Sequence, residues 1–457
     1  MGVDRSLWSY RELTAALGLP RTAGPAVRGV AIDSRLTEPG DLFVALPGDP
    51  GPRFQATVRS DRDGHDFVPH AVENGAVAVL VHRAIADPGI PQLRVADTLD
   101  GLWSLGRAGR ERLDGPVVAV TGSSGKTTFK SFAAAALDAF ATSGSLNNHI
   151  GVPLSLARTP RESTAAIYEI GTNHPGEIEP LARLARPDVA VLLNVHPAHI
   201  ENFGSLDAIR EEKTTIAHGL EPGGTFVRPS HIDGPGRSLI FGTDAAADVR
   251  LVRSAGTVAE FETPAGPFEC GVPGGGEHRA MSVCALAAVL VALDLPLDRL
   301  NRLVDEAVPK GRGNRASVRG ITVIDESYNA NPASMAATLT AFVAEPGRRI
   351  AILGDMLELG EDARRYHADL AGHCGPIDGV FCAGEQIRVL YDALAPGQRL
   401  GFADRPDAAF VDLCATALRP GDRVLVKASN GIFWANGFVD ALIAALDRAD
   451  DVSSTPP

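Results

Sequence analysis

Short apolar runs alternate with longer amphipathic stretches along most of the chain. In its middle part, strand-like and helix-like segments follow one another in the order 117–121, 126–140, 165–170, 176–185, 188–195 and 205–219. This alternation is typical of βαβ units and a largely parallel sheet. Shorter pieces between residues 224 and 272, separated by Gly and Pro, predict an antiparallel extension, and helices are expected at 278–293 and 297–307.

The same pattern predicts a further α/β unit on each side. The N-terminal unit has strand-like runs at 27–33, 41–46 and 77–82 and helices at 67–74 and 98–113. After residue 313, strand-like runs near 320–325, 348–354, 378–383, 399–403 and 422–427 alternate with helices, as in a doubly wound, Rossmann-like domain. We therefore predict an α/β protein of three domains, 1–114, 115–312 and 313–448, followed by a disordered tail at 449–457.

The composition excludes some partners and indicates the cellular compartment. The net charge of −13 argues against a general binder of nucleic acids or anionic membranes. No run approaches roughly 18 apolar residues, so no membrane span is expected, and the first residues lack the apolar core of a signal peptide. The five cysteines contain no C-x-x-C pair, which fits reduced thiols. We expect a monomeric, cytoplasmic protein whose partners are small molecules.

A glycine-rich turn after the first central strand carries the clearest chemical signal. Gly122 and Gly125 allow backbone N–H groups to face an anion, and the following helix N-terminus adds the positive end of its dipole. Lys126 can reach the β- and γ-phosphates of a nucleotide, and the Thr127 hydroxyl is placed to bind Mg²⁺. A plain turn is the alternative, but Gly-Lys-Thr-Thr after an apolar run favours a nucleoside triphosphate site. Its predicted members are Gly122, Ser123, Ser124, Gly125, Lys126, Thr127 and Thr128.

Polar residues also follow the next two central strands. Glu169 ends one apolar run, and Asn194 and His199 follow another. Ligands bind beyond the carboxyl ends of parallel strands, so these groups are expected near the turn, with Glu169 able to hold Mg²⁺. A solvated strand end and a structural histidine are the alternatives for Glu169 and His199.

Six motifs resemble those of the Mur ligases and stand in the same order. They are Thr121-Gly-Ser-Ser-Gly-Lys-Thr-Thr128, Leu146-Asn-Asn-His-Ile-Gly-Val-Pro153, Glu169-Ile-Gly-Thr-Asn-His-Pro-Gly-Glu-Ile178, Asn194-Val-His-Pro-Ala-His199, Asp325-Glu-Ser-Tyr-Asn-Ala-Asn-Pro332 and Gly354-Asp-Met-Leu-Glu-Leu-Gly360. The resemblance runs from about residue 33 to 442. Ordered agreement over hundreds of residues is more specific than any single motif.

This resemblance implies an ATP-dependent amide ligase that works through an acyl phosphate. The motifs at 173–178 and 327–332 imply the member that joins D-alanyl-D-alanine to UDP-N-acetylmuramoyl-tripeptide in peptidoglycan precursor synthesis. Similar ligases use an N-terminal domain for the UDP-sugar, a central P-loop ATPase domain and a C-terminal domain for the amine. The implied cofactors are ATP, Mg²⁺ (two ions) and a carbamate on Lys213.

The resemblance also assigns roles to particular residues. Catalytic roles fall on Lys126, Glu169, His199 and Lys213, and the metal ligands would be Thr127, Glu169, His199 and Lys213. Further nucleotide contacts are implied for Asn147, Asn148, Arg312, Asp325, Asn329 and Asn331. Substrate contacts are implied for Ser34, Arg35, Asn173 and His174. Taken without the family, Lys213 would be an exposed helical lysine, Asn331 a helix cap and residues 33–35 a surface turn.

Several positions depart from the family pattern. Arg279 and Ser282 replace two asparagines near the adenine, Ser145 replaces an asparagine, and Asn430 replaces an arginine. The loop at 47–62 is also longer than expected. These departures leave open a related ligase that joins a different carboxylate and amine, for instance in specialised metabolism. A degenerate ligase acting as a nucleotide-binding regulator is a second alternative, which ADP release would exclude. No guanine motif or phosphoacceptor site supports a generic P-loop GTPase or kinase.

Overall fold

The computed structural model describes residues 6–49 and 61–448, so the predicted tail at 449–457 and most of the 47–62 loop lie outside the described residues. The N-terminal domain has a parallel sheet in the order β1 (Gly29–Ala31), β2 (Asp41–Val44), β3 (Ala78–Val81), β4 (Gln92–Arg94). Its helices are α1 (Tyr10–Ala16), α2 (Val68–Glu73) and α3 (Thr98–Glu111). The last strand was not predicted, because its three residues are too short to show a pattern.

Helix α3 fixes the N-terminal domain to the central one. It packs on α5 (Gly151–Ala157), and a Cβ at Gly109 would lie 2.2 Å from the Leu156 carbonyl oxygen, so only glycine permits this approach. The indole of Trp8 donates to the Ala157 carbonyl over 2.8 Å. The boundary between the two domains is therefore closely packed.

The central domain contains an eight-stranded sheet in the order β12-β11-β10-β9-β8-β7-β5-β6. Its strands are β5 (Val117–Thr121), β6 (Ala166–Glu169), β7 (Val189–Leu192), β8 (Thr225–Pro229), β9 (Ser238–Gly242), β10 (Val249–Ala255), β11 (Val258–Thr263) and β12 (Gly266–Gly271). Along β5, Val118 and Val120 face a core with α4 (Lys126–Leu137) and α9 (Glu277–Ala292), while Val117 and Ala119 face a core with α5 and α6 (Ile178–Ala185). Alternation along one strand thus fills both faces of the sheet.

The predicted antiparallel extension is wrong for β8 and β9. Both run parallel to their neighbours, and antiparallel pairing begins only at β10. A short, glycine-rich connection normally indicates a hairpin. Here Gly234 lies against the Phe226 ring, where an added Cβ would be 2.2 Å away, so the short crossover passes close to the sheet. The helix expected at 297–307 is also wrong, since two 3₁₀ turns, Leu297–Arg302 and Asp305–Ala307, replace it.

The C-terminal domain has a six-stranded sheet in the order β13-β14-β18-β15-β16-β17. The strands are β13 (Asn314–Val318), β14 (Ile321–Glu326), β15 (Arg349–Gly354), β16 (Gly379–Ala383), β17 (Arg399–Ala403) and β18 (Arg423–Lys427). All pairs are parallel except β13 with β14. The helices are α10 (Pro332–Phe342), α11 (Ala363–Asp369), α12 (Ala371–Cys374), α13 (Arg388–Ala393), α14 (Ala408–Ala417) and α15 (Phe438–Arg448). Separate cores cover the two faces, as a doubly wound fold requires.

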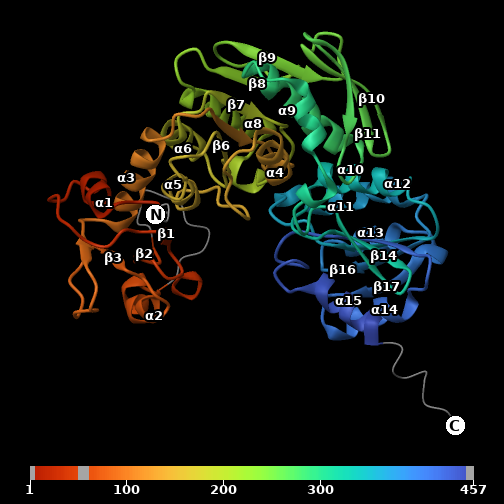
Figure 1. Ribbon diagram of the computed structural model, residues 1–457. Coiled ribbons are helices and arrows are strands. Elements are labelled where there is room, and N and C mark those ends of the chain that lie inside the picture. The colour runs from red at the N-terminus through yellow and green to blue at the C-terminus, as the bar shows by residue number, and fades with distance from the viewer. Residues whose placement is uncertain (1–5, 50–60, 449–457) are drawn as a thin grey trace.

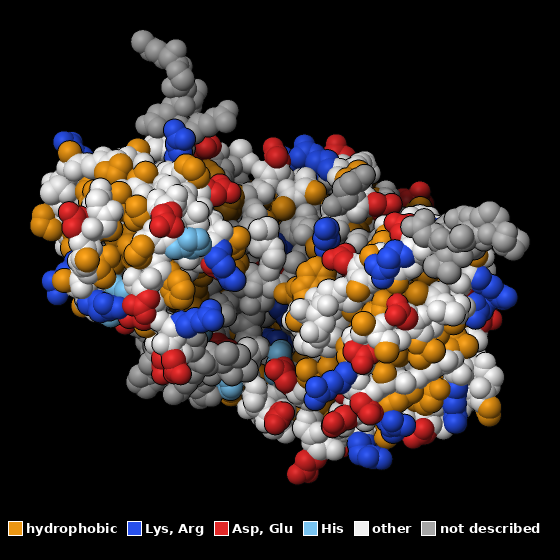
Figure 2. Space-filling view, turned by 90° about the horizontal axis from the view of Figure 1, so that it is seen from below, with side chains coloured by type: hydrophobic (Ala, Val, Ile, Leu, Met, Phe, Trp, Pro, Cys, Tyr) orange, Lys and Arg blue, Asp and Glu red, His pale blue; other side chains and the backbone are white. Residues whose placement is uncertain are grey.

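The central domain connects the other two, which lie on either side of it (Figure 1). Seen from below, the surface is hollowed between the two lobes of the molecule (Figure 2). The carboxyl ends of the central strands and the N-terminus of α10 line this region, so the fold positions a site between the central and C-terminal domains.

Candidate active site

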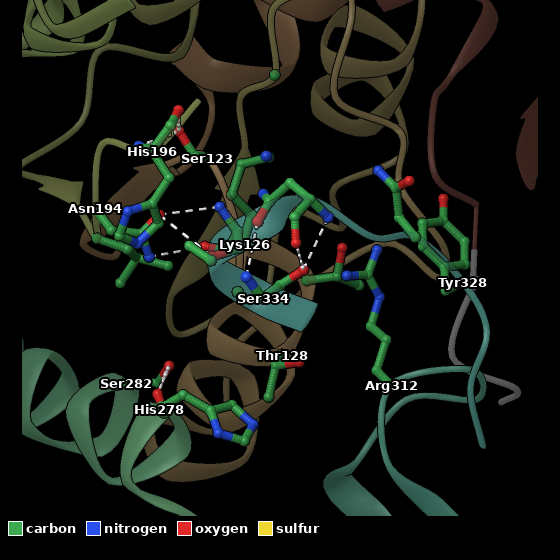
Figure 3. A pocket seen from close by; sticks show the side chains of 18 of the residues that line it. Ser123, Lys126, Thr128, Asn194, His196, His278, Ser282, Arg312, Tyr328 and Ser334 are labelled. Atoms are coloured by element: carbon green, nitrogen blue, oxygen red, sulfur yellow. Dashed lines mark hydrogen bonds between the residues drawn. The ribbon is translucent and has the colours of Figure 1, made fainter. Parts of the chain in front are cut away.

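A cavity of about 730 Å³ lies between the central and C-terminal domains. The central domain contributes the glycine-rich turn, Glu169 and Asn194, and the C-terminal side contributes Arg312 and Tyr328. Lys126 stands between these two groups, with Asn194 and His196 on one side and Arg312 and Tyr328 on the other (Figure 3). A volume of this size is in the range of small-molecule sites.

The glycine-rich turn has the backbone that an anion cradle needs. Gly125 has a φ of 81° directly before α4, a conformation that favours glycine. Asn194 locks the turn: its side-chain oxygen accepts from the Ser124 N–H at 3.0 Å, and its carbonyl accepts from the Ser123 N–H at 3.1 Å. The N–H groups of the first turn of α4 have no partner within the helix. An anion bound by these N–H groups would therefore lie at residues 126–128.

Lys126 lies across the mouth of the cradle. Its ammonium donates to the Gly122 carbonyl over 2.7 Å. Burial lowers the pKa of Lys126, and the charge of Arg312 lowers it further, against the opposing effect of Glu169. A nucleotide phosphate would supply the negative charge that this partly buried cation lacks.

Thr127 and Glu169 meet at the floor of the cavity. The Thr127 hydroxyl donates to Glu169 Oε2 over 2.7 Å, and the Asn147 amide donates to Glu169 Oε1 over 2.8 Å. Lys130, one turn after Lys126, lies 3.7 Å from Glu169 Oε2. Both partners of this ion pair are nearly fully buried, at 3% and 2% side-chain exposure. A buried carboxylate with a hydroxyl beside it suits a hard cation such as Mg²⁺.

Of the other two predicted metal ligands, His199 lines the cavity with Thr127 and Glu169, whereas Lys213 does not. His199 has a φ of 56° and its Nδ1 contacts Glu358 Oε2, which the C-terminal domain supplies. Lys213 is buried on α8 (Leu206–Thr214) and does not line the cavity. Burial, followed by the charge of Lys126, lowers the pKa of Lys213 to about 7. Within residues 6–49 and 61–448, no three His, Cys, Asp or Glu side chains form a cluster that could hold a metal ion.

The segment 311–313, which joins the central and C-terminal domains and which we call the hinge, forms the opposite wall together with the C-terminal domain. Arg312 stacks over the Tyr328 ring at 4.0 Å, and its guanidinium donates to Ser145 Oγ over 3.3 Å. Asn329 and Asn331 line the cavity, and the Asn331 side chain also caps α10 by accepting from the Ser334 N–H over 2.8 Å. The helix-cap interpretation is therefore confirmed for Asn331, and its contact with a nucleotide stays a prediction.

Asp325 differs from its predicted position. Its carboxylate accepts from the Ser327 N–H and hydroxyl, at 3.0 and 2.5 Å, and it does not line the cavity. Burial raises the pKa of Asp325. The carboxylate orients the 325–328 turn, on which Tyr328 lies.

The predicted substrate residues lie in two places. Ser34 and Arg35 are on the N-terminal domain, where Ser34 Oγ is 3.0 Å from His70 Nδ1 and Arg35 pairs with Asp33 at 2.6 Å. Asn173 lines the cavity together with Asn148, and the backbone N–H groups of Asn173 and His174 donate to Glu177. Ser34, Arg35 and His174 do not line the cavity.

Comparison with known proteins shows the family of this chain. The Mur ligase middle domain matches residues 120–290, and the Mur ligase glutamate ligase domain matches residues 311–430. The UDP-N-acetylmuramoyl-tripeptide–D-alanyl-D-alanine ligase of Escherichia coli (strain K12) is 34% identical over 82% of this chain and 85% of its own length. The chain belongs to the Mur ligase family. The resemblance inferred from the six motifs is thereby confirmed.

Solved Mur ligase structures share the three-domain fold. A crystal structure of MurF from Acinetobacter baumannii is 30% identical, with a TM-score of 0.80 over 97% of this chain and 100% of that chain. A MurF ligase from Thermotoga maritima, in complex with ADP, is 28% identical, with a TM-score of 0.74 over 92% of this chain and 98% of that chain. No helix within the described part of the chain is long and apolar enough to cross a membrane.

Sequence reasoning missed two lysines of this Mur ligase site. Lys130 pairs with Glu169, and Lys427 lines the cavity with its ammonium 3.6 Å from Glu326 Oε2. The chain has only five lysines among 43 basic residues, and Lys126, Lys130, Lys213 and Lys427 are all at or beside the site. Lysine offers a compact charge and a shiftable pKa that arginine does not. The rarity of lysine was the signal that could have identified both residues.

Proposed function

We propose that this chain is an ATP-dependent amide ligase that joins D-alanyl-D-alanine to UDP-N-acetylmuramoyl-tripeptide, in peptidoglycan precursor synthesis. The observation that carries the proposal is that a phosphate cradle on one domain and a polar wall on another line a single cavity. The printed name of the Escherichia coli relative supports these two substrates. That relative and the two MurF structures favour this activity over ligation of a different carboxylate and amine.

The chemistry needs an activated acyl group, since a carboxylate has no leaving group. A carboxylate oxygen of the tripeptide attacks the γ-phosphorus of ATP, the bond to the bridging oxygen breaks, and ADP leaves. The amine nitrogen then attacks the acyl carbon, loses a proton, and phosphate departs with the bonding electrons. Lys126 and the first-turn N–H groups of α4 would stabilise the transferring phosphoryl charge, and Arg312 would approach it from the hinge.

The residues at the cavity floor fit Mg²⁺. Thr127 and Glu169 place a hydroxyl and a carboxylate oxygen 2.7 Å apart at the N-terminus of α4. We propose that they hold one ion, with His199 and modified Lys213 serving a second. Bound Mg²⁺ would neutralise phosphate charge and orient the oxygens for in-line displacement. His199 is within contact of Glu358, so its ring would have to exchange that partner for the metal.

Lys213 has the environment in which a carbamate forms. Burial lowers the pKa of Lys213 to about 7, so a much larger fraction of its amine is neutral near pH 7 than in an ordinary lysine. The neutral nitrogen attacks the carbon of CO₂, forms an N–C bond and releases a proton. The product is an anion, which removes the repulsion between Lys213 and Lys126 and supplies oxygen ligands for a hard cation.

The three domains would divide the substrates between them. Residues 1–114, with Ser34 and Arg35, would bind the UDP-sugar, residues 115–312 would bind ATP, and residues 313–448 would bind the amine. Asn173 and His174 would contact the acyl substrate near the cavity. Asn147, Asn148, Asn329 and Asn331 would contact the nucleotide, directly or through the turns that they hold. We further propose that the ligase acts as a cytoplasmic monomer.

One assay tests the proposal. ADP release is measured with UDP-N-acetylmuramoyl-tripeptide and D-alanyl-D-alanine, singly, together, and with other dipeptides or amines in place of the second substrate. We expect release to require both substrates and to be fastest with D-alanyl-D-alanine. Release with a different amine only would support the alternative ligase, and no release under any condition would support a regulator.

A further inference from the structure

Arg279 joins the two domains that line the cavity. It lies on α9 of the central domain, and its guanidinium reaches acceptors in three separate segments. Nη1 donates to the carbonyls of Gly274 and Gly275, at 3.1 and 3.0 Å, within its own domain. Nη2 donates to the Arg312 carbonyl over 2.8 Å and contacts Glu326 Oε1. One side chain therefore connects the central domain, the hinge and the end of strand β14 in the C-terminal domain.

The carboxylate of Glu326, which pairs with Arg279, is largely buried. The side chains of Arg279 and Glu326 are 8% and 10% exposed. Lys427 approaches the other oxygen of Glu326 at 3.6 Å and donates to the Asn329 carbonyl over 3.2 Å. Removing one partner from a buried pair leaves an uncompensated buried charge, so the loss of either Arg279 or Glu326 alone should be costly.

The local backbone accommodates this guanidinium. A Cβ at Gly313, where φ is 107°, would lie 1.9 Å from Arg279 Nη2. Gly274 and Gly275 also have positive φ, at 71° and 64°, which turns their carbonyls toward Nη1. Glycines on both sides of the guanidinium thus permit a contact that other residues would block.

We infer that Arg279 is a positioning residue for phosphoryl transfer, which acts by fixing the peptide of Arg312. Arg279 and Glu326, with Arg312, Gly313 and Lys427, form a set that we call the seam. Since the Arg312 carbonyl is held by Arg279, the Arg312 side chain leaves the backbone in one direction. That direction brings it onto the Tyr328 ring and Ser145 Oγ, at the edge of the cavity. The effect of Arg279 on phosphoryl transfer, the kinetic part, rests on the proposed function. The fixing of the Arg312 peptide by Arg279, the structural part, does not.

The structural part is tested on the ligand-free enzyme by hydrogen exchange followed by mass spectrometry. The amides of Arg312 and Gly313 donate to the carbonyls of Pro309 and Asp325, at 3.1 and 2.7 Å. In Arg279→Met we expect exchange at 311–314 to rise several-fold, while the cradle peptide at 121–128 is unchanged. Arg253→Met, which breaks the exposed pair with Glu260, is the matched control and should change neither. Unchanged exchange at 311–314 in a folded Arg279→Met variant would overturn the inference.

The kinetic part uses a double-mutant cycle. We expect Arg279→Met to lower kcat by roughly tenfold to a hundredfold with KM for ATP changed less than threefold, since small displacements of a positioned group are costly. Arg279→Lys, which keeps the charge, should recover part of that loss. In an Arg312→Met background, Arg279→Met should have little further effect. An equal loss in both backgrounds would show that Arg279 does not act through Arg312.

Two other outcomes distinguish the positioning role of Arg279 from direct contact with the nucleobase, and the inference from the proposed function. If Arg279 read the nucleobase directly, the loss in Arg279→Met would differ between ATP and GTP, which would overturn the positioning role. If wild-type enzyme shows no ATP-dependent ligation but exchange at 311–314 still rises in Arg279→Met, the proposed function fails and the link through the hinge stands. If Arg279→Met does not fold, Arg279→Lys and Glu326→Gln supply the same exchange comparison.

Discussion

The phosphate cradle and the seam line the same cavity but are built in opposite ways. The cradle is one continuous segment, residues 121–128, and its turn is held by hydrogen bonds to Asn194 and His196 of the same domain. The seam takes its residues from four distant parts of the chain and holds them by hydrogen bonds and ion pairs across two domains. The cradle therefore forms within one domain, whereas the seam exists only when both domains are in place. A change in the cradle should affect chemistry alone, and a change in the seam should affect chemistry and domain geometry together.

The largest effect is expected in the cradle. Lys126→Ala should lower kcat by some hundreds-fold, because it removes a directed charge at the transition state worth about 3–4 kcal/mol. Steady-state ADP release measures kcat, and thermal unfolding measures stability separately. Unfolding should change little, since the side chain of Lys126 makes one hydrogen bond within the described residues, to the Gly122 carbonyl over 2.7 Å, and burial already disfavours its charge. Activity within a few-fold of wild type would remove the cradle from the chemistry.

Lys213 extends the comparison to a residue behind the cradle. Lys213→Ala should be severely impaired and partly restored by short carboxylic acids, which can occupy the oxygen site of a carbamate. Lys213→Arg is the matched control: it keeps the positive charge and should not be rescued. Full activity in CO₂-depleted buffer, with no label retained from ¹³CO₂, would contradict the carbamate.

Gly313→Ala tests the seam without removing any charge. The new Cβ would displace the Arg279 guanidinium, so kcat should fall by roughly tenfold. Backbone strain should add about 1–3 kcal/mol of destabilisation. Gly421→Ala is the matched control, since it has a similar φ of 94° but nothing within 4 Å of its Cβ. It should lose stability and keep its kcat. Equal kcat values in Gly313→Ala and Gly421→Ala would show that the seam has no role in catalysis.

A further prediction concerns acid stability at His278, the residue next to Arg279 of the seam. Burial, followed by the charge of Arg279, lowers the pKa of His278 from 6.5 to about 4. Between these values the unfolded chain binds a proton that the folded chain does not, so stability falls as pH falls from 6.5 to 4. His278→Gln should lose less stability over this range, by about 2–3 kcal/mol at most. Denaturant unfolding at pH 7 and 4.5 measures the difference, and equal losses would count against a buried neutral His278.

The parts of the site that could be predicted from sequence are those that depend on local residues. Gly125, Lys126 and Thr127 were identified because a strand, a glycine turn and a helix must follow one another in the chain. Arg279 was recognised only as a departure from the family, since its partner Glu326 lies 47 positions away and nothing local connects the two. Lys130 was missed because its position on a helix does not show that it pairs with Glu169; only the rarity of lysine in the chain pointed to it.

The same reasoning explains the errors in the fold. Most of the strands and longer helices were predictable from hydrophobic periodicity, but the short strand β4 and the helix α5 were not. The direction of β8 and β9 was not, because it depends on how the short crossover at 230–237 packs on Phe226, a tertiary contact. The position of Asp325 was likewise decided by hydrogen bonds within its turn rather than by the strand end on which it lies.

The most direct test of the central claim follows oxygen through the reaction. UDP-N-acetylmuramoyl-tripeptide labelled with ¹⁸O in its reacting carboxylate is incubated with ATP and D-alanyl-D-alanine, and the phosphate released is weighed by mass spectrometry. An acyl phosphate transfers one labelled oxygen to each phosphate formed, so we predict phosphate heavier by one ¹⁸O in step with the amide product. Amide formed with unlabelled phosphate would contradict activation of the carboxylate by phosphoryl transfer, and with it the role given to the cradle.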